Sequence, residues 1–152
     1  MNLVTRAIEP QDYDSWRALY GAYADFYRDT QTDGQMREVW TWLMDPGHDV
    51  QAIVAIDDAA YLAGLAHYRP FARPLGALIG CFLDDLFVSP DARGSGAADA
   101  LLEHLRSLAR ESGWSVVRWI TADNNYRARA KYDQYATRTM WVTYDMLPTA
   151  ST

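Results

Sequence analysis

Cysteine occurs only once in this sequence, at Cys81, so the chain cannot form an internal disulfide. Lone thiols are typical of proteins from reducing compartments, and we therefore expect a cytoplasmic protein. No apolar run approaches the roughly 20 residues that a membrane-spanning helix needs, so no membrane partner is expected. The three histidines are scattered without the spacing of a metal site, and no metal is predicted.

Lysine is equally scarce. Lys131 is the only one, which excludes the Gly-Lys-Ser/Thr sequence of a P-loop. The formal net charge of −6 and the pI of about 4.9 argue against a nucleic-acid partner and suit a cationic substrate. With 152 residues, of which 49% are hydrophobic and 22% charged, the chain is expected to form a single globular domain over residues 1–152.

Hydrophobic periodicity predicts an α/β fold with six strands and four helices. A strand, a helix and a further strand follow one another between residues 77 and 121, which predicts a parallel crossover. The predicted strands span residues 3–8, 50–56, 61–68, 77–88, 116–121 and 140–147, and the predicted helices span residues 11–28, 35–44, 98–112 and 125–135.

The most informative stretch is Leu83–Leu102. It begins as a strand, turns at Ser89-Pro90 and passes through a glycine-rich loop into a helix. Such a loop can hold a phosphate, because glycines let the backbone approach closely and the helix N-terminus carries partial positive charge. Arg93 adds a full charge and a planar set of donors.

The spacing within this loop selects among phosphate ligands. A dinucleotide fingerprint requires a third small residue where this sequence has Asp99. The pattern that does match is Arg-x-x-Gly-x-Ala, filled by Arg93, Gly96 and Ala98 and preceded by Val-x-Pro. This pattern resembles the coenzyme A pyrophosphate loop of the GNAT family of N-acetyltransferases.

A second motif supports the same resemblance. Asn125, Ala128 and Tyr132 match the Asn-x-x-Ala-x-x-x-Tyr segment of GNAT enzymes, and they follow the strand after the pyrophosphate helix as expected. The resemblance covers essentially the whole chain and looks closest to small polyamine and histone-type acetyltransferases. It implies a single-domain GNAT fold, in which a mixed, mostly antiparallel sheet with a splayed parallel strand pair is flanked by helices.

The resemblance also implies a site for acetyl-CoA. The backbone of Leu86, Phe87 and Val88 would pair with the pantetheine arm, and Tyr132 would donate a proton to the departing thiolate. Asn125 would bond the cofactor or an ordered water, and a helix cap is the alternative for this residue. The residues expected to hold the pyrophosphate are Arg93, Gly94, Ser95, Gly96, Ala97 and Ala98.

The acceptor amine must lose a proton before it can attack. An amine with a pKa of about 10.4 is protonated at neutral pH, and removing its proton costs about 4–5 kcal/mol. Asp84 and Asp85 match the acidic pair of the polyamine enzymes. Because strand side chains alternate, only one is expected to face the pocket. We expect Asp84 to be a water-relayed base and Asp85 to bind the amine or support the structure.

An aromatic stripe lies on the first long helix. Trp16, Tyr20, Tyr23 and Tyr27 follow the i, i+4, i+7, i+11 pattern and share one face. A face of this kind packs into the core, or part of it forms the wall of a pocket for an organic cation. In the second interpretation, the three tyrosines bind substrate together with Asp85.

These features favour an acetyl-CoA-dependent N-acetyltransferase that acts on a primary amine of a polyamine, another small cation or a lysine-containing peptide. The alternative is a non-catalytic acyl-CoA-binding sensor or partner module, because Ala136-Thr137 stands where the family has a glycine-aromatic pair. Lys131 also replaces the family's leucine before the tyrosine. The aromatic residues Trp141 and Tyr144 in the last predicted strand, together with the resemblance, lead us to expect a homodimer.

Overall fold

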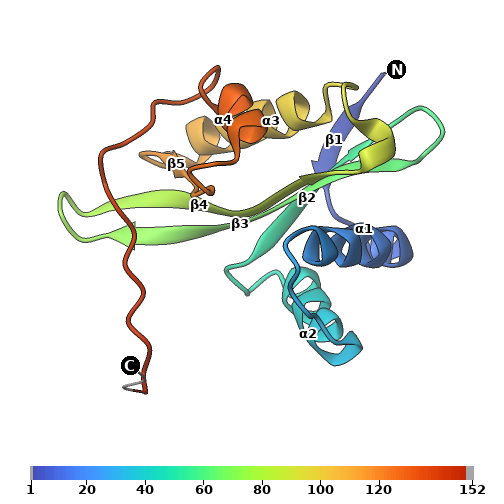
Figure 1. Cartoon of the computed structure of the whole chain (residues 1–152), viewed down its shortest axis with the longest axis horizontal. Helices are drawn as coiled ribbons and strands as arrows, with labels where there is room; N and C mark the ends of the chain where they lie inside the picture. The colour runs from blue at the N-terminus through green and yellow to red at the C-terminus, as the bar shows by residue number, and fades with distance from the viewer. Residues whose placement is uncertain (1, 150–152) are drawn as a thin grey trace. The chain divides into compact units, whose positions relative to one another are not determined.

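Five strands form one sheet in the computed structural model, which describes residues 2–149 (Figure 1). The order β1-β2-β3-β4-β5 follows the sequence, and neighbouring strands are antiparallel except for the parallel pair β4–β5. The mixed, mostly antiparallel sheet predicted from the sequence is therefore confirmed. The strands are β1 (Val4–Ala7), β2 (Gln51–Ile56), β3 (Leu62–Arg73), β4 (Leu78–Val88) and β5 (Val117–Arg118).

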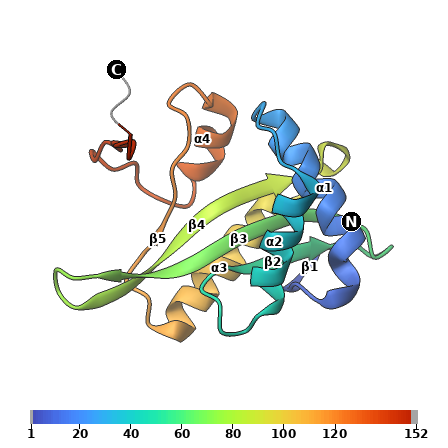
Figure 2. The same cartoon turned by 90° about the horizontal axis from the view of Figure 1, so that it is seen from below.

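Residues up to Ile120 form one compact unit, and those from Thr121 onward form a second. The first unit contains the sheet and three α-helices, and the second contains α4 (Tyr126–Tyr132). Helices α1 (Tyr13–Phe26) and α2 (Asp33–Met44) cover one face of the sheet, whereas α3 (Ala97–Ser112) covers the other (Figures 1 and 2). Two short 3-10 turns, Pro10–Asp12 and Pro90–Ala92, precede α1 and α3.

Local chemistry explains the ends of these helices. Thr32 and Gln35 form a capping box at the start of α2, in which each side chain accepts a hydrogen bond from the backbone N–H of the other residue. Gly113 ends α3 with a left-handed backbone at φ 72°, a conformation that glycine adopts without steric cost. The buried face of α3 follows its 3.6-residue period and carries Ala97, Leu101, Leu102, Leu105 and Ala109.

The stripe on α1 supplies the centre of the core on the opposite face. Trp16 is fully buried, Leu19 is nearly so, and both pack with Leu43 of α2 and with Leu65 and Phe87 of the sheet. Burying a large aromatic ring is among the most favourable contributions a single side chain makes to folding. The packing interpretation of the stripe therefore holds for Trp16.

Three expectations about strands are corrected. The predicted loop after residue 68 is a continuation of β3 to Arg73, although it contains Pro70. Because β2 pairs with β3 only as far as Tyr68, Pro70 lies beyond that ladder, where a missing N–H is tolerated. The predicted strand over residues 116–121 is reduced to Val117–Arg118.

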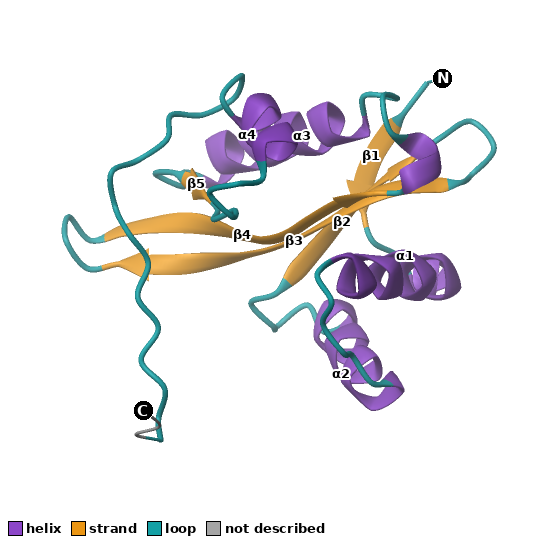
Figure 3. Cartoon of the chain, viewed as in Figure 1, coloured by secondary structure: helices purple, strands orange, loops and turns teal. Residues whose placement is uncertain are grey.

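The predicted strand over residues 140–147 is absent, and Figure 3 shows that segment as loop. A strand requires a neighbour for its backbone N–H and C=O groups, and within residues 2–149 this segment is not hydrogen-bonded into any ladder. Its apolar side chains are correspondingly exposed, among them Met140 at 96% and Trp141 at 84%.

Candidate active site

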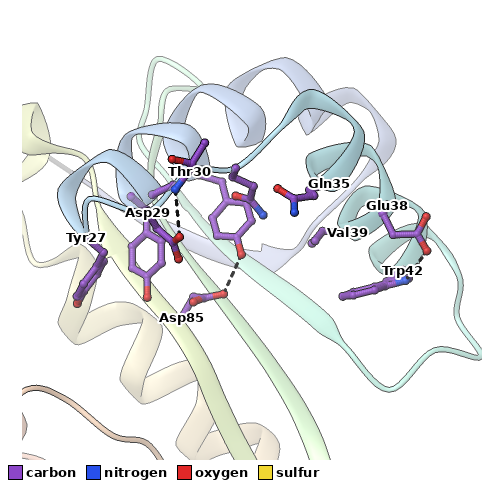
Figure 4. Close-up of a pocket in the computed structure, with 12 residues that line it drawn as sticks. Tyr27, Asp29, Thr30, Gln35, Glu38, Val39, Trp42 and Asp85 are labelled. Carbon is purple, nitrogen blue, oxygen red and sulfur yellow. Dashed lines mark hydrogen bonds between the residues drawn. The ribbon is translucent and has the colours of Figure 1, made fainter. Parts of the chain in front are cut away.

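A pocket of about 610 Å³ lies between the end of α1, the following loop, α2 and the middle of β4 (Figure 4). Its lining includes four aromatic side chains and three carboxylates. The aromatic residues are Tyr20, Tyr23, Tyr27 and Trp42, and the carboxylates are those of Asp29, Glu38 and Asp85. The part of its lining that the structure describes includes no lysine, arginine or histidine. Aromatic faces and carboxylates both attract organic cations, so the pocket suits a protonated amine.

The structure brings the predicted substrate-binding residues together here. Tyr20 donates to Asp85 Oδ2 over 3.4 Å, and Tyr23 also forms a hydrogen bond with the Asp85 side chain. The rings of Tyr20 and Tyr23 stack with centroids 5.8 Å apart, and Tyr27 contacts Tyr23 at 4.8 Å. The cation-pocket interpretation of the stripe therefore fits its three tyrosines, while Trp16 lies in the core.

Asp85 receives a further hydrogen bond from His67, whose Nδ1 lies 2.8 Å from Oδ2. Burial opposes ionisation of this carboxyl, but the hydrogen bond and electrostatic attraction of His67, together with the hydrogen bonds from Tyr23 and Tyr20, outweigh burial, and the pKa of Asp85 is lowered from its ordinary value of 3.8. The phenols respond in the opposite direction. Burial and the charge of Asp85 raise the pKa of Tyr20 to about 12 and raise that of Tyr23 as well. The site at neutral pH thus contains one carboxylate and two protonated phenols.

Asp84 has a different partner. Arg69 Nε donates to Asp84 Oδ2 at 3.0 Å and to Oδ1 at 3.2 Å. It is absent from the pocket lining, so of the two carboxylates only Asp85 lines the pocket. We expected strand alternation to direct the two side chains to opposite faces of the sheet, and this explanation is wrong. His67 and Arg69 share one face of β3, and the carboxylates they bind therefore lie on that same face.

A β-bulge places the two carboxylates on one face. His67 is opposite Asp85 in the ladder and Tyr68 is opposite Leu83, which leaves Asp84 without a partner residue in β3. The extra residue in β4 shifts the alternation by one position at this point. Bulges commonly occur beside active sites, where they redirect side chains.

The same strand presents free backbone to a ligand. On its β5 side, β4 is paired at Cys81 and Phe82 only, and within residues 2–149 no strand pairs with that edge from Leu83 to Val88. The predicted pantetheine residues Leu86, Phe87 and Val88 lie in this open portion. An amide-rich chain could form a ladder with their N–H and C=O groups.

The glycine-rich loop follows directly. Gly94 and Gly96 have positive φ angles of 80° and 89°, and a Cβ built at either position would contact nothing within 4 Å. The side-chain oxygen of Ser95 is buried without a hydrogen-bond partner in the described structure, and Gly96 is the N-cap of α3 with no side-chain cap. An open concave backbone, an unsatisfied hydroxyl and an uncapped helix start fit a pyrophosphate. Exposed Arg93 precedes them.

Asn125 and Tyr132 lie in the second unit, at the two ends of α4. Asn125 is the N-cap of this helix, and its side-chain oxygen accepts a 3.4 Å hydrogen bond from Ala128 N–H. The structure therefore shows the helix cap that we gave as the alternative role of Asn125. The contacts with acetyl-CoA predicted for Asn125 and Tyr132 remain predictions.

His67 was not identified from the sequence as a site residue. The available signal was its position in the buried run Leu62–Tyr68, where it is the only ionisable side chain apart from the phenol of Tyr68. Cys81, in contrast, is fully buried, and burial with the nearby charge of Asp84 raises the pKa of its thiol to about 12. It is an inert core thiol, as expected.

Two further features bear on function. No group of three histidine, cysteine or acidic side chains among the described residues could hold a metal ion. None of the described helices has the length and apolar character to cross a membrane.

Comparisons with known proteins agree with these features. The sequence matches the family model described as "Acetyltransferase (GNAT) family" over residues 16–136. A D-amino-acid N-acetyltransferase of Saccharomyces cerevisiae, HPA3, is 29% identical over 143 residues, covering 93% of this chain and 89% of the relative. The uncharacterized N-acetyltransferase YhfO of Bacillus subtilis is 28% identical over 129 residues, which are 85% of each chain.

Solved structures show the same fold. The crystal structure of a ribosomal-protein-alanine N-acetyltransferase from Brucella melitensis biovar Abortus 2308 superposes with a TM-score of 0.81. The match covers 97% of this chain and 99% of that chain at 22% sequence identity, and a likeness at this level of identity concerns the fold alone.

Proposed function

The chain belongs to the GNAT family of acetyltransferases and is an N-acetyltransferase; we propose that it transfers the acetyl group of acetyl-CoA to a primary amine of a small cationic molecule. The observation that carries the choice of acceptor is the lining of the pocket, where three carboxylates stand among four aromatic rings. A polyamine, or another small molecule with more than one amine, fits such a lining best. A lysine-containing peptide is also compatible with this lining.

Acetyl-CoA would be held by β4 and the start of α3. The open backbone of Leu86–Val88 would bind its amide-rich arm, and the loop Arg93–Ala98 would bind its pyrophosphate. When bound, the cofactor supplies an acetyl group activated as a thioester. The bound thioester would lie beside the pocket, because Asp85, which lines it, is only one residue before Leu86.

Asp85 is suited to bind the ammonium group, but it is poorly suited to remove a proton from that group. Transfer from an amine with a pKa of about 10.4 to a carboxylate with a pKa below 3.8 is uphill by more than six units, or about 9 kcal/mol. Loss of the same proton to water at pH 7 costs about 4–5 kcal/mol. We therefore assign the amine-binding role to Asp85. Solvent removes the proton, with Asp84 as the relay through water.

Once neutral, the amine attacks the thioester carbonyl. A nitrogen–carbon bond would form, the nitrogen would lose its second proton to water, the carbon–sulfur bond would break, and the sulfur would leave as a thiolate. Tyr132 is the proposed proton donor to that thiolate, on the strength of the Asn125–Tyr132 motif. Proton transfer from a phenol with an ordinary pKa of about 10 to a thiolate whose conjugate acid has a pKa of about 8.5 is only modestly unfavourable.

A D-amino acid is the second candidate class, because the relative HPA3 is named as a D-amino-acid N-acetyltransferase. An amino acid brings its own carboxylate, and the described lining offers that carboxylate no basic partner while it presents Asp29, Glu38 and Asp85. The electrostatics of the pocket therefore favour a cation without a carboxylate.

The test is a turnover screen with acetyl-CoA in which thiol release is measured against four acceptor classes: polyamines, D-amino acids, aminoglycosides and lysine peptides. We expect the highest kcat/KM with spermidine or a similar polyamine. Highest activity with D-alanine or D-phenylalanine would transfer the assignment to the second class. Binding of acetyl-CoA without turnover of any amine would support the sensor alternative.

A further inference from the structure

A buried chain of hydrogen bonds connects the core of the protein to the pocket. The indole N–H of Trp16 donates to His67 Nε2 over 2.9 Å, and His67 Nδ1 lies 2.8 Å from Asp85 Oδ2. Trp16 has no exposed surface and His67 is 2% exposed. Three elements, α1, β3 and β4, each contribute one residue to this chain, which ends at the pocket carboxylate.

The direction of each hydrogen bond follows from its partners. An indole N–H can only donate, so Nε2 of His67 must accept. The ring proton consequently lies on Nδ1, and the carboxylate of Asp85, which can only accept, receives it. Trp16 and Asp85 therefore both require the tautomer in which the imidazole donates to Asp85.

We propose that His67 is a positioning residue for acceptor binding: it orients the Asp85 carboxylate through Nδ1–H, while the indole of Trp16 holds the other ring nitrogen, Nε2. This inference rests on the proposed function in that it takes Asp85 as the group that binds the acceptor amine. An ionised carboxylate has about four lone-pair sites, and the hydrogen bonds from His67, Tyr20 and Tyr23 occupy three of them, which leaves capacity for the amine.

The same geometry excludes His67 as a proton relay. A relay must accept a proton on one nitrogen and release it from the other, but Nε2 is occupied by an indole donor deep in the core. The proton lost by the acceptor therefore leaves through the pocket itself. His67 acts only through Asp85.

A purely structural role would not require this arrangement. Burying an imidazole and an indole N–H is costly unless both are hydrogen-bonded, and two apolar side chains of similar size would fill the same space without that requirement. The rest of β3 around His67 is apolar and buried, including Leu65 and Ala66. The hydrogen bonds of Trp16 and His67 end at Asp85, which lines the pocket. We therefore assign this pair a role in ligand binding.

The groups that act on Asp85 come from every element packed against it. His67 faces it from β3, and Tyr20 and Tyr23 face it from α1. Asp29 and Glu38 line the same pocket, and Asp84, which Arg69 of β3 binds, precedes it on β4. Removal of His67 would leave only the two phenols to offset the cost of burying the Asp85 charge.

The experiment follows the Asp85 carboxyl by carbon NMR during a pH titration of the acceptor-free protein, with Asp85→Asn used to assign its signal. His67→Leu removes the donor, and His67→Asn retains an amide N–H close to the position of Nδ1. We expect a raised pKa for Asp85 in His67→Leu and a value near that of the wild type in His67→Asn. With acetyl-CoA and spermidine as probes, kcat/KM should fall by up to about a hundredfold in His67→Leu, while the KM for acetyl-CoA stays unchanged.

An unchanged Asp85 pKa in folded His67→Leu would overturn the proposal. If that variant does not fold, His67→Gln provides the second test: its amide lies near the position of Nε2 and leaves the position of Nδ1 without a donor, so the pKa of Asp85 should rise, and an unchanged value would overturn the proposal. The titration requires no turnover. Inactivity of the wild type toward spermidine would therefore contradict the proposed acceptor and leave the Asp85 result interpretable.

Discussion

Asp84 and Asp85 are neighbours in the sequence and lie on the same face of the sheet, yet they bind different partners. Arg69 holds Asp84 outside the pocket, while His67, Tyr20 and Tyr23 hold Asp85 in its wall. The bulge in β4 produces this arrangement, because it leaves Asp84 without an opposite residue. Substituting the two carboxylates separately should therefore affect different steps of the reaction.

Asp85→Asn removes the charge that binds the ammonium group and preserves the shape of the side chain. A hydrogen bond to a charged group contributes about 1.5–3 kcal/mol, so the KM for spermidine should rise by roughly tenfold to a hundredfold. The KM for acetyl-CoA should remain within a few-fold, because the backbone of Leu86–Val88 is unaltered. Steady-state kinetics with each substrate varied in turn would check this, and an unchanged KM for spermidine would contradict it.

Asp84→Asn is the matched comparison at the adjacent position. If Asp84 relays the proton through water, the rate should fall most at the acidic end of the pH profile, where the amine most needs a base. The KM for spermidine should change little, because Asp84 is not part of the pocket lining. A pH–rate profile of the same shape as that of the wild type would remove Asp84 from the mechanism.

The glycine-rich loop predicts how acetyl-CoA affects stability. A ligand that binds only the folded state at a hundredfold excess over its Kd adds about 2.7 kcal/mol to the free energy of unfolding. Gly96→Glu should abolish the resulting thermal shift, because its carboxylate would occupy the open space where the pyrophosphate is expected.

Gly113→Glu is the control for backbone strain. Gly113 also has a positive φ, at 72°, and its Cβ position is also open, but it lies at the other end of α3. Both variants should lose similar stability without ligand, by about 1–2 kcal/mol for a left-handed non-glycine residue. Only Gly113→Glu should keep the shift with acetyl-CoA, and equal shifts in the two variants would show that the loop does not bind it.

Much of this fold could be predicted from the sequence because its elements have strong local signals. The leucines of α3 follow one helical face, and Asp57 lies in a short connection between two apolar strands. The aromatic stripe on α1 likewise contains three tyrosines that line the pocket, whereas the phosphate-binding role of the glycine-rich loop stays a prediction.

What could not be predicted depends on pairing between distant residues. The bulge arises from the register of β3 against β4, which local alternation does not encode, so the premise used to separate Asp84 from Asp85 was wrong. His67 is a site residue because its two ring nitrogens contact Asp85 and Trp16, and Trp16 lies 51 positions away in sequence. The segment 140–147 has the composition of a strand, but composition does not specify a partner strand.

The Arg6–Asp12 pair should control stability in acid. The hydrogen bond from Arg6 lowers the pKa of Asp12 in the folded protein despite its burial. A carboxyl with a lowered folded pKa stabilises the protein above its unfolded pKa of about 3.9, and this contribution is lost as the pH falls through the folded value. Urea unfolding at pH 7 and pH 3 should show a smaller acid-induced loss in Asp12→Asn than in the wild type.

Exposed Asp14, two residues after Asp12 in the first turn of α1, provides the control. Asp14→Asn should keep the full acid-induced loss of the wild type. If Asp12→Asn and Asp14→Asn respond alike, the pair does not govern the acid dependence.

We expect a homodimer in which the exposed segment 140–147 contributes to the contact. Its large apolar side chains include Trp141 at 84% and Tyr144 at 89% exposure, and side chains of this kind are typical of interfaces. Light scattering at micromolar concentration should give twice the monomer mass of 17.2 kDa, and a Trp141→Ser/Tyr144→Ser double variant should shift the equilibrium toward monomer. A monomeric mass for the wild type would contradict this prediction.

The role of Tyr132 can be tested by removing a single oxygen atom. Tyr132→Phe deletes the phenol hydroxyl that would protonate the departing thiolate and leaves the aromatic ring nearly unchanged. Turnover should fall by roughly 10²–10⁴, the usual range for loss of a positioned proton donor, while the affinity for acetyl-CoA stays within a few-fold.

Tyr126→Phe is the matched control, because Tyr126 lies on the same short helix and is 74% exposed. Its turnover should equal that of the wild type. A thiol leaving group of lower pKa needs less help from an acid, so the deficit of Tyr132→Phe should shrink with an acyl donor of that kind. A deficit independent of the leaving group, or parental turnover in Tyr132→Phe, would show that this phenol is not the general acid.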